Sequence, residues 1–247
     1  MKWVEGKICG QHEWAPGLYS LFVQASILPF EAGQFIQISL DAPTYKLFRP
    51  YSLVNAPDDP TLEFYYTLVK AGELTPFLPQ LSIGDSIGIA ERAHGRFVLS
   101  DVPEAKILWL IATGTGLGPF LSLLKTKEPW SRFEKIVLVH SVRYSNELTH
   151  QALIEMWQEQ YPQQFLWVPL VTRENAVHAH RERVTTLLLS GNLEALTQLT
   201  LSALTSQVML CGNPEMIDEV VALLLKRGLT INRIKQKGQI TLENYWK

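Results

Sequence analysis

The chain has very few cysteines, and they are far apart. Cys9 and Cys211 are the only two among 247 residues, which excludes a Cys-x-x-Cys zinc knuckle and a cysteine-ligated iron–sulfur cluster. The six histidines lack HExxH-type spacing, and we interpret His178 and His180 as part of a polar loop and not as metal ligands. Any redox chemistry in this chain therefore requires an organic cofactor.

The sequence also lacks an excess of either charge and any long apolar run. Its 22 Lys and Arg residues and 24 Asp and Glu residues give a net charge of −2, so no general basic field favours nucleic acid. The opening "MKWVEGKICG" contains charges and a glycine where a secretory signal needs an apolar stretch, and "ILWLIA" is too short to cross a bilayer. We expect a monomeric cytoplasmic protein that binds neither nucleic acid nor membrane.

Hydrophobic residues are plentiful, at 47% with 10% aromatic, which is typical of a packed globule. Before residue 100 they form short runs rich in β-branched and aromatic residues, separated by proline and glycine turns such as "APDDP". Closely spaced short strands predict an antiparallel barrel or sandwich, and closure into a barrel would hide the strand edges. The predicted strands are "LYSLFVQA", "GQFIQISL", "YSLV", "LEFYYTLV" and "DSIGIA".

After residue 100 apolar strands alternate with helical stretches. The strands are "ILWLIA", "KIVLVHS", "FLWVPLVT" and "QVMLCG", and the helices lie near 118–126, 147–161, 183–200 and 214–227. Strands this apolar are expected in a parallel sheet with helices on both faces. We therefore predict a two-domain α/β and β protein, with an antiparallel β-barrel at 1–100 and a parallel-sheet nucleotide-binding domain at 101–247. The boundary lies near Leu99 to Asp101.

A glycine-rich turn, "ATGTGLGPF" at 112–120, joins the first of these strands to a helix. Its glycines allow a tight turn with backbone amides pointing one way, and the following helix adds its positive end, a combination that binds phosphate. The spacing GxGxG followed by Pro119 differs from the GxGxxG fingerprint, and no carboxylate ends the next strand to hold a ribose hydroxyl. By itself the motif is also compatible with an ordinary strand–helix turn.

Arginines stand where that carboxylate is missing. Arg143 follows the second strand of this half, Arg173 follows the third, and Arg183 lies a few residues into the next loop. The carboxyl ends of parallel strands share one edge, where ligands bind in open α/β sheets. Guanidinium groups suit phosphate oxygens, so these residues favour the 2′-phosphate of NADP. The alternative is that they are solvated loop residues.

The first half contains "RPYSLVNAP" at 49–57, followed by "YYTLVKAGELTPFL" at 65–78. Arg49 can clamp a phosphate, Tyr51 offers a flat face for stacking, and Ser52 offers a hydroxyl to a ring nitrogen. Without further context the segment is equally compatible with a plain strand.

The RxYS arrangement, the glycine loop, "LCGNPEM" and the terminal "ENYW" occur in this order in the ferredoxin NADP reductase family. From end to end the chain resembles the compact bacterial flavodoxin/ferredoxin NADP reductases. The resemblance implies an FAD-binding barrel, an NADP-binding α/β domain, and a C-terminal tail that returns to the FAD. It also implies an enzyme that transfers a hydride from NADPH to flavin N5 and passes single electrons to flavodoxin or ferredoxin.

The resemblance implies specific residues as well. Arg49 would hold the FAD pyrophosphate, while Tyr51, Ser52 and Cys211 would be catalytic; the alternative for Cys211 is a small buried side chain at a strand end. The FAD residues implied are Arg49, Pro50, Tyr51, Ser52, Tyr65, Tyr66, Thr67, Glu73, Leu74, Thr75, Thr115, Tyr245 and Trp246. The NADP residues implied are Gly114, Gly116, Val142, Arg143, Arg173, Arg183, Gly212, Asn213 and Asp218.

Two other functions share these modules. One is an NAD(P)H-dependent flavin reductase or the reductase component of an oxygenase, and the other is an electron-transfer subunit of a larger complex. Relatives of the oxygenase and subunit types tend to carry a cysteine-ligated cluster, which two cysteines cannot build. The basic stretch "KRGLTINRIKQK" at 226–237, with Arg233, Lys235 and Lys237, is the candidate surface for an acidic electron carrier. Its alternative is a solvated face.

Overall fold

The computed structural model describes residues 1–40, 44 and 46–243. The chain forms two compact units. The first, here called the barrel unit, contains Met1–Leu99 and Gly118–Thr126; the second, the sheet unit, contains Ser100–Leu117 and Lys127–Lys247. Among the described residues, no helix has the length and apolarity needed to cross a bilayer.

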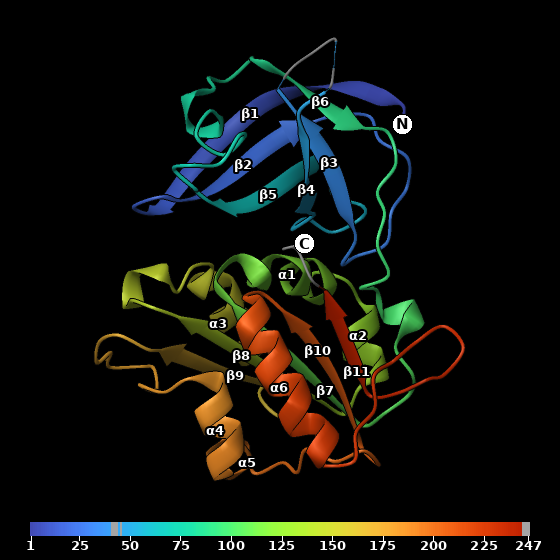
Figure 1. Cartoon of the computed structure of the whole chain (residues 1–247), viewed down its shortest axis with the longest axis vertical. Coiled ribbons are helices and arrows are strands. Elements are labelled where there is room, and N and C mark those ends of the chain that lie inside the picture. Colours follow the sequence, from blue (N-terminus) through green and yellow to red (C-terminus); the bar gives the residue numbers. More distant parts are fainter. Residues whose placement is uncertain (41–43, 45, 244–247) are drawn as a thin grey trace. The chain divides into compact units, whose positions relative to one another are not determined.

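The barrel unit is built on a six-stranded sheet in the order β4-β3-β6-β1-β2-β5, with antiparallel pairs (Figure 1). The two ends of this order meet, since the Val54 amide just after β4 donates to the Glu63 carbonyl in β5 at 3.0 Å. The sheet is therefore closed, and the predicted antiparallel barrel is confirmed. Its elements are β1 (Trp3–Ala15), β2 (Leu18–Gln24), β3 (Phe35–Ser39), β4 (Phe48–Ser52), β5 (Thr61–Thr67), η1 (Leu78–Gln80), β6 (Ser86–Ala90) and η2 (Leu99–Asp101), the last ending in the sheet unit.

Two strands of the barrel differ from the sequence-based prediction. The longest strand, β1, was missed, because glycines and charged residues interrupt its apolar alternation and only Gly6, Ile8 and Ala15 are buried in it. It forms because β2 and β6 pair with its backbone on either side. The strand predicted at "YSLV" begins earlier, at Phe48, and ends at Ser52. Pro50 is tolerated there because β4 itself pairs only with β3, and the bond that closes the sheet onto β5 comes after it, at Val54.

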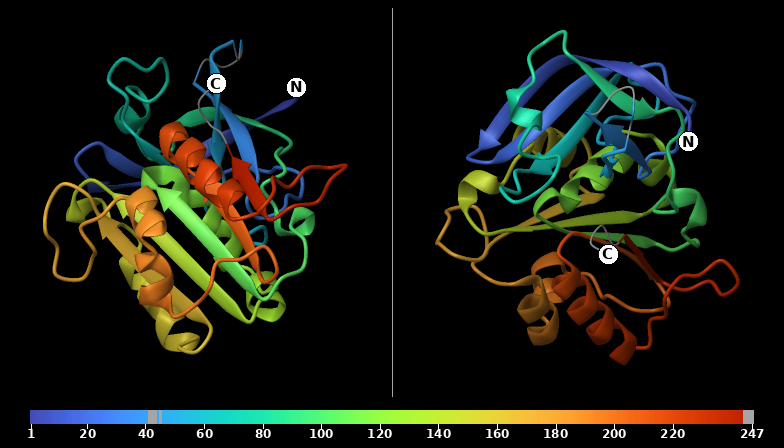
Figure 2. Two further views of the ribbon diagram at one scale, coloured as in Figure 1. Left: turned by 60° about the horizontal axis from the view of Figure 1, so that its bottom comes forward. Right: turned by 45° about the horizontal axis from the view of Figure 1, so that its top comes forward.

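The sheet unit contains a five-stranded parallel sheet in the order β11-β10-β7-β8-β9, whose strands run side by side in the left view of Figure 2. The strands are β7 (Ile107–Thr113), β8 (Lys135–Val142), β9 (Phe165–Val171), β10 (Ser206–Cys211) and β11 (Ile240–Glu243). The helical segments are η3 (Gly114–Leu117), α2 (Glu128–Arg132), η4 (Ser145–Glu147), α3 (Gln151–Gln160), α4 (Val184–Ser190), α5 (Asn192–Thr197) and α6 (Pro214–Lys226).

Both faces of the parallel sheet are buried, as predicted. On one face Trp109 and Val137 pack in a cluster with Leu187 of α4 and Val220 of α6. On the other face the alternating residues, such as Leu108, are equally inaccessible. The helix predicted at 183–200 is two helices, divided at Gly191, which adopts φ 78°. The short elements α2 and β11 were not predicted.

The strand order creates a switch point between β7 and β10. The chain runs outward from β7 to β8 and β9 and then returns to place β10 on the other side of β7. The loops that follow β7 and β10 consequently leave the sheet next to each other at its carboxyl edge, where open α/β sheets bind ligands.

The helix after the glycine loop, α1 (Gly118–Leu124), belongs to the barrel unit. The Ser122 hydroxyl donates to the Asn55 carbonyl at 2.7 Å. The Lys125 ammonium lies 3.2 Å from the Glu63 carboxylate, and these side chains are only 21% and 9% exposed. The other Glu63 oxygen accepts a hydrogen bond from Ser20 at 2.8 Å. A partly buried ion pair thus fixes the residue that follows α1 to β5.

Candidate active site

In the barrel unit the RxYS residues lie on β4, where Arg49 and Tyr51 share one face because side chains alternate along a strand. The Tyr51 ring is held at steep angles by two aromatic neighbours, with centroid distances of 6.4 Å to Phe64 and 6.3 Å to Tyr66. Burial raises the pKa of the Tyr51 phenol, opposed by the nearby Arg49 charge. The phenol is therefore neutral at pH 7, and the plane of its ring is fixed by packing.

Arg49 forms an ion pair with Glu73, and half of each side chain or more remains exposed. One guanidinium nitrogen also donates to the Phe48 carbonyl at 2.8 Å. The structure thus brings together two residues that the resemblance implies as FAD contacts. A phosphate bound here would compete with the Glu73 carboxylate for Arg49 in a solvent-exposed setting, where ion pairs are weak.

The segment after β5 is a compact turn. The Thr75 hydroxyl accepts from the Val69 amide at 3.0 Å and donates to the Val69 carbonyl at 3.2 Å. Leu74 is buried and Thr67 is exposed. The Thr75 hydroxyl, which the resemblance implies as an FAD contact, is here bonded to the backbone of its own turn.

Tyr65 and Tyr66 are both buried on β5. Tyr66 stacks on Tyr19 with a centroid distance of 5.5 Å, and its hydroxyl accepts from Gln11 at 2.9 Å. Burial raises the pKa of the Tyr66 phenol. These two side chains form packed structure, while Tyr51 and Ser52 are only partly buried.

At the carboxyl edge of the parallel sheet, the loops after β7 and β10 touch backbone to backbone. The Thr113 hydroxyl accepts from the Asn213 amide at 2.7 Å. Gly212 adopts φ 132°, and a Cβ there would overlap the Thr113 hydroxyl and lie 2.6 Å from the Thr113 carbonyl oxygen. A Cβ on Gly116 would lie 2.7 Å from the Gly212 nitrogen. Glycine is required at both positions, and Thr113, which the sequence analysis missed, joins the two loops.

The opposite side of the glycine loop is open. Gly114 adopts φ 53°, and a Cβ built on it would meet no atom within 4 Å. Asn213 begins α6, where its side chain accepts from the Met216 amide at 3.2 Å. Asp218 lies exposed further along α6. A loop with an open backbone side, backed by a second loop, fits a phosphate group.

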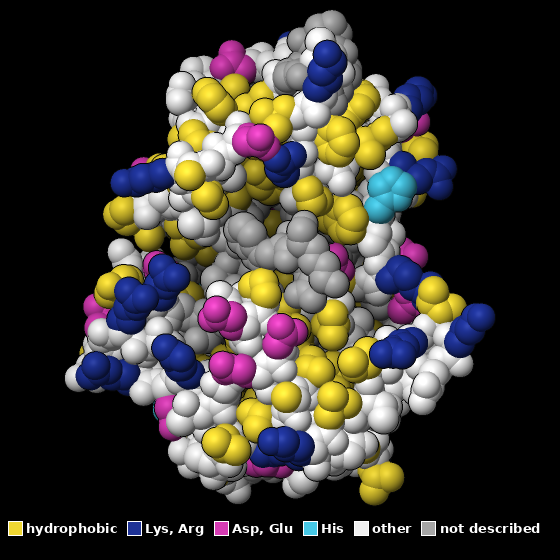
Figure 3. All heavy atoms as spheres, viewed as in Figure 1, with side chains coloured by type: hydrophobic (Ala, Val, Ile, Leu, Met, Phe, Trp, Pro, Cys, Tyr) yellow, Lys and Arg dark blue, Asp and Glu magenta, His cyan; other side chains and the backbone are white. Residues whose placement is uncertain are grey.

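The arginines meet at the same edge of the sheet. The Arg173 amide donates to the Arg143 carbonyl at 2.9 Å, and the Thr172 amide donates to the Val142 carbonyl at 3.0 Å, so the two strand ends are joined. The loop after β9 returns at His180, which forms a parallel bridge with Leu170 and therefore carries Arg183 towards the same end of β9. Figure 3 shows Lys and Arg side chains gathered over this loop, at the lower left.

These three arginines are exposed, and within the part of the chain that the structure describes none of them forms an ion pair. The nearby carboxylates are engaged elsewhere. Glu147 accepts from the Arg143 amide at 2.8 Å and Glu174 accepts from the Ser145 amide at 2.6 Å, and the hydrogen bonds from Ser145 lower the pKa of Glu174. The cationic charge at this edge is therefore available to an anion.

Cys211 ends β10 completely buried, in register with Ala112 of β7 and Glu243 of β11. Burial raises the pKa of the Glu243 carboxyl to about 7. The sequence analysis missed this carboxyl because it did not predict β11. Tyr245 and Trp246 lie outside the described residues. Among the described residues, no group of three or more His, Cys, Asp or Glu side chains could hold a metal ion.

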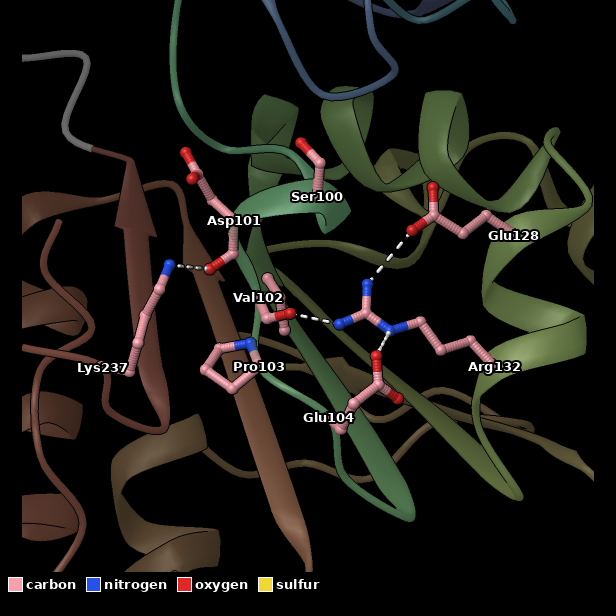
Figure 4. Close-up of a pocket in the computed structure, with 8 residues that line it drawn as sticks. All are labelled: Ser100, Asp101, Val102, Pro103, Glu104, Glu128, Arg132 and Lys237. Atoms are coloured by element: carbon pink, nitrogen blue, oxygen red, sulfur yellow. Dashed lines mark hydrogen bonds and ion pairs between the residues drawn. The ribbon is translucent and has the colours of Figure 1, made fainter.

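A hollow of about 420 Å³ at the opposite, amino edge of the sheet has a different character (Figure 4). Arg132 is held there by the Val102 carbonyl and by Glu104 and Glu128. Lys237 donates to the Asp101 carbonyl at 3.0 Å. Both basic groups donate to protein partners, so these contacts anchor the loops that line the hollow.

Comparison with known proteins agrees with this geometry. The family described as "Oxidoreductase NAD-binding domain" matches residues 110–222, which include the glycine loop and the β10 loop. Flavodoxin/ferredoxin–NADP reductases of Shigella flexneri and Escherichia coli (strain K12) are each 40% identical over 245 residues, with 99% of both chains covered. The chain belongs to the ferredoxin NADP reductase family.

Solved structures extend the comparison. A ferredoxin NADP+ reductase from Neisseria gonorrhoeae with bound FAD and NADP is similar over 100% of both chains, with 30% identity and a TM-score of 0.93. A cytochrome P450 reductase from Amycolatopsis shares the fold, with a TM-score of 0.81 at 24% identity over 99% of this chain and 70% of the other. The barrel followed by a parallel-sheet domain is thus the fold of ferredoxin NADP reductases.

The contact between the two loops yields a first prediction. Gly212→Ala should lower the free energy of unfolding by about 3 kcal/mol, because the new methyl group overlaps Thr113 in addition to straining the backbone. Gly191→Ala is the matched control: its φ of 78° is also positive but its surroundings are open, so it should cost only about 1 kcal/mol. Urea unfolding of the purified variants measures both, and equal losses would contradict the role given to the close approach.

Proposed function

We propose that this protein is an FAD-dependent reductase that takes electrons from NADPH and delivers them to flavodoxin or ferredoxin. The observation that carries the proposal is the carboxyl edge of the sheet unit. This edge contains the glycine loop, its partner loop after β10 and three arginines that, among the described residues, pair with no carboxylate, in a chain of this family. We also propose that the enzyme works as a monomer in the cytoplasm, where NADPH and small acidic carrier proteins meet.

The barrel, residues 1–100, is the proposed FAD domain, and its fit rests on β4. Arg49 offers a half-exposed guanidinium to a phosphate, and the fixed Tyr51 ring offers a platform for a planar ligand. Ser52 would donate to the flavin ring. The remaining residues proposed to contact FAD are Pro50, Tyr65, Tyr66, Thr67, Glu73, Leu74, Thr75, Thr115, Tyr245 and Trp246.

Residues 101–247 are the proposed NADP domain. Gly114 and Gly116 would place backbone amides against the pyrophosphate, while Arg143, Arg173 and Arg183 would bind the 2′-phosphate. Val142 and Asp218 would line the nucleotide site. Cys211, Gly212 and Asn213 would hold the turn beside the nicotinamide, with the buried Cys211 side chain excluding water.

The protein needs few catalytic acids and bases, because the cofactor carries out the electron transfer. Bound FAD supplies the chemistry, because it accepts a hydride from NADPH and can release electrons one at a time. The side chains bind, orient and exclude water, which brings the reacting groups to a productive distance. Tyr51 fixes a ring plane and Ser52 offers one hydrogen bond.

The purified chain tests the proposed function directly. It should carry tightly bound yellow FAD and should reduce cytochrome c with NADPH only when flavodoxin or ferredoxin is added. A flavin reductase would instead consume NADPH with free flavin and no carrier. A colourless protein, or cytochrome c reduction independent of a carrier, would contradict the proposal.

The arginines predict the nucleotide preference. Arg173→Ala and Arg183→Ala should each raise the KM for NADPH by about tenfold, since a hydrogen bond to a charged phosphate is lost. The KM for NADH should barely change, because NADH has no 2′-phosphate. Arg181→Ala, on the same loop and with only a 3.4 Å contact to Asn175, is the matched control and should leave both constants unchanged. Steady-state kinetics with both nucleotides tests this prediction. Equal effects on the KM values for NADPH and NADH would contradict the assignment of these arginines to the 2′-phosphate.

The loop before β11 is the proposed docking surface for the acidic carrier. Arg233 and Lys235 are exposed on it, and among the described residues neither forms an ion pair. The base of the loop is pinned, since Asn232 and Lys237 both donate to the Asp101 carbonyl, at 2.9 and 3.0 Å. Two unpaired cations on an anchored loop create a field that steers an acidic partner without touching the nucleotide.

Charge reversal at this loop gives the corresponding prediction. The double variant Arg233→Glu with Lys235→Glu should slow flavodoxin reduction about tenfold at low salt and leave NADPH–ferricyanide activity unchanged. The difference should shrink at high salt, because salt screens exposed charges. Lys106→Glu with Lys127→Glu, an equal charge change on exposed lysines elsewhere in the sheet unit, is the control. Flavodoxin rates equal to those of this control would refute the docking surface.

A further inference from the structure

We infer that His140 is a positioning residue for the glycine loop: by holding the Gly114 carbonyl it aims the backbone amide of Thr115, whose side chain is proposed to contact FAD, at the nucleotide pyrophosphate. The inference rests on the proposed function, which places a nicotinamide nucleotide on this loop. It concerns a residue of β8 that the candidate site does not otherwise use.

A single hydrogen bond joins the His140 side chain to the backbone of the glycine loop. His140 is fully buried in β8, in register with Ala112 of β7, two residues before the loop begins. Its Nε2 lies 3.2 Å from the Gly114 carbonyl oxygen. A carbonyl can only accept, so Nε2 carries the ring proton and donates it to Gly114.

The state of the ring agrees with this assignment. Burial lowers the pKa of His140 to about 4; the hydrogen bond to Gly114 opposes this shift and the charge of His150 adds to it. The ring is therefore neutral at pH 7 and has one N–H group. That one donor is committed to the loop.

The planarity of the peptide bond transmits the effect to the other side of the loop. In a trans peptide the carbonyl of one residue and the N–H of the next point in opposite directions. Because the Gly114 oxygen points towards His140, the Thr115 N–H points away from His140. The loop is also uncovered at Gly114, since no atom lies within 4 Å of a Cβ built there.

Core packing alone does not account for a histidine here. Among the described residues, Nδ1 of His140 is buried and has no hydrogen-bond partner, which an apolar side chain would avoid at no cost to packing. The other anchors of the loop act elsewhere: Thr113 binds the Asn213 amide, and Gly116 packs against Gly212. Only the bond from His140 fixes the orientation of the Gly114–Thr115 peptide among these contacts.

A positioning role for His140 predicts a distinct pattern of nucleotide affinities. The pyrophosphate is common to NADP and NAD, whereas the 2′-phosphate belongs to NADP alone. Loss of the His140 bond should therefore weaken both nucleotides equally. Loss of an arginine at the sheet edge should weaken NADP and spare NAD.

The test compares His140→Phe with His140→Gln in the FAD-loaded protein, by calorimetric titration with NADP+, NAD+ and 2′-AMP. Phe keeps a flat ring without a donor, and Gln keeps an amide donor at a similar distance from the backbone. We expect His140→Phe to weaken NADP+ and NAD+ by the same factor, about fivefold, as for one lost hydrogen bond. Binding of 2′-AMP, which has no pyrophosphate, should not change, and His140→Gln should bind all three within about twofold of the parent chain.

Arg173→Ala provides the opposite pattern, with weaker NADP+ and 2′-AMP and unchanged NAD+. The inference is overturned if His140→Phe leaves NADP+ affinity intact, if it weakens 2′-AMP as much as NADP+, or if His140→Gln loses as much as His140→Phe. Should His140→Phe fail to yield folded flavoprotein, His140→Leu takes its place with the same expected pattern. If the parent chain binds no NADP+ at all, the proposed function fails instead, so the two failures are distinguishable.

Discussion

The close approach of the loops after β7 and β10 is the constraint on which the candidate site depends. Two parallel strands that are neighbours in the sheet end side by side, and their loops can touch only if side chains are absent at the contact. Gly212 and Gly116 meet this requirement, and Thr113 closes the contact with a 2.7 Å bond to the Asn213 amide. The open side of the glycine loop and the start of α6 are both positioned by this contact. A methyl group at Gly212 would move them apart.

The glycine loop also links the two units through the chain itself. Its first residues belong to the sheet unit, and α1, which follows directly, belongs to the barrel unit. There the Lys125–Glu63 pair is largely removed from water, and Ser20 donates to the second carboxylate oxygen. Buried ion pairs contribute little net stability but penalise any arrangement that separates the charges. The pair therefore specifies where α1 packs more than it strengthens the barrel.

Sequence periodicity predicted the architecture because most of the strands coincide with recognisable runs of apolar, β-branched or aromatic residues. The apolar runs of β7 to β10 are buried on both faces, and β2 and β5 are short runs rich in aromatic and aliphatic residues that are mostly buried. Strands held mainly by backbone pairing were missed, since β1 contains glycines and charges and β11 has only four residues. The arginines and the glycine loop were found because their residue types depart from what a core or a plain turn requires.

Contacts that depend on tertiary register could not be found in this way. Thr113 is one apolar-strand residue among several, and its role appears only when β10 is known to lie beside β7. Glu243 becomes a buried carboxyl only once β11 pairs with β10. His140 lies in the apolar run "KIVLVHS", and its sequence context gives no indication of a function. Its role becomes visible only when the fold brings β8 next to Gly114. In each case the missing information is which strands are neighbours.

The charge at the sheet edge follows from how its carboxylates are used. Arg143 and Arg173 lie close to Glu147 and Glu174, and such neighbours would ordinarily form ion pairs. Instead Glu147 binds the Arg143 and Tyr144 amides, and Glu174 binds Ser145. The backbone amides thus occupy the acidic groups, which leaves the guanidinium forks without anionic partners among the described residues. What this edge offers a phosphate is therefore local: guanidinium groups that pair with no carboxylate among the described residues, in a chain whose net charge is −2.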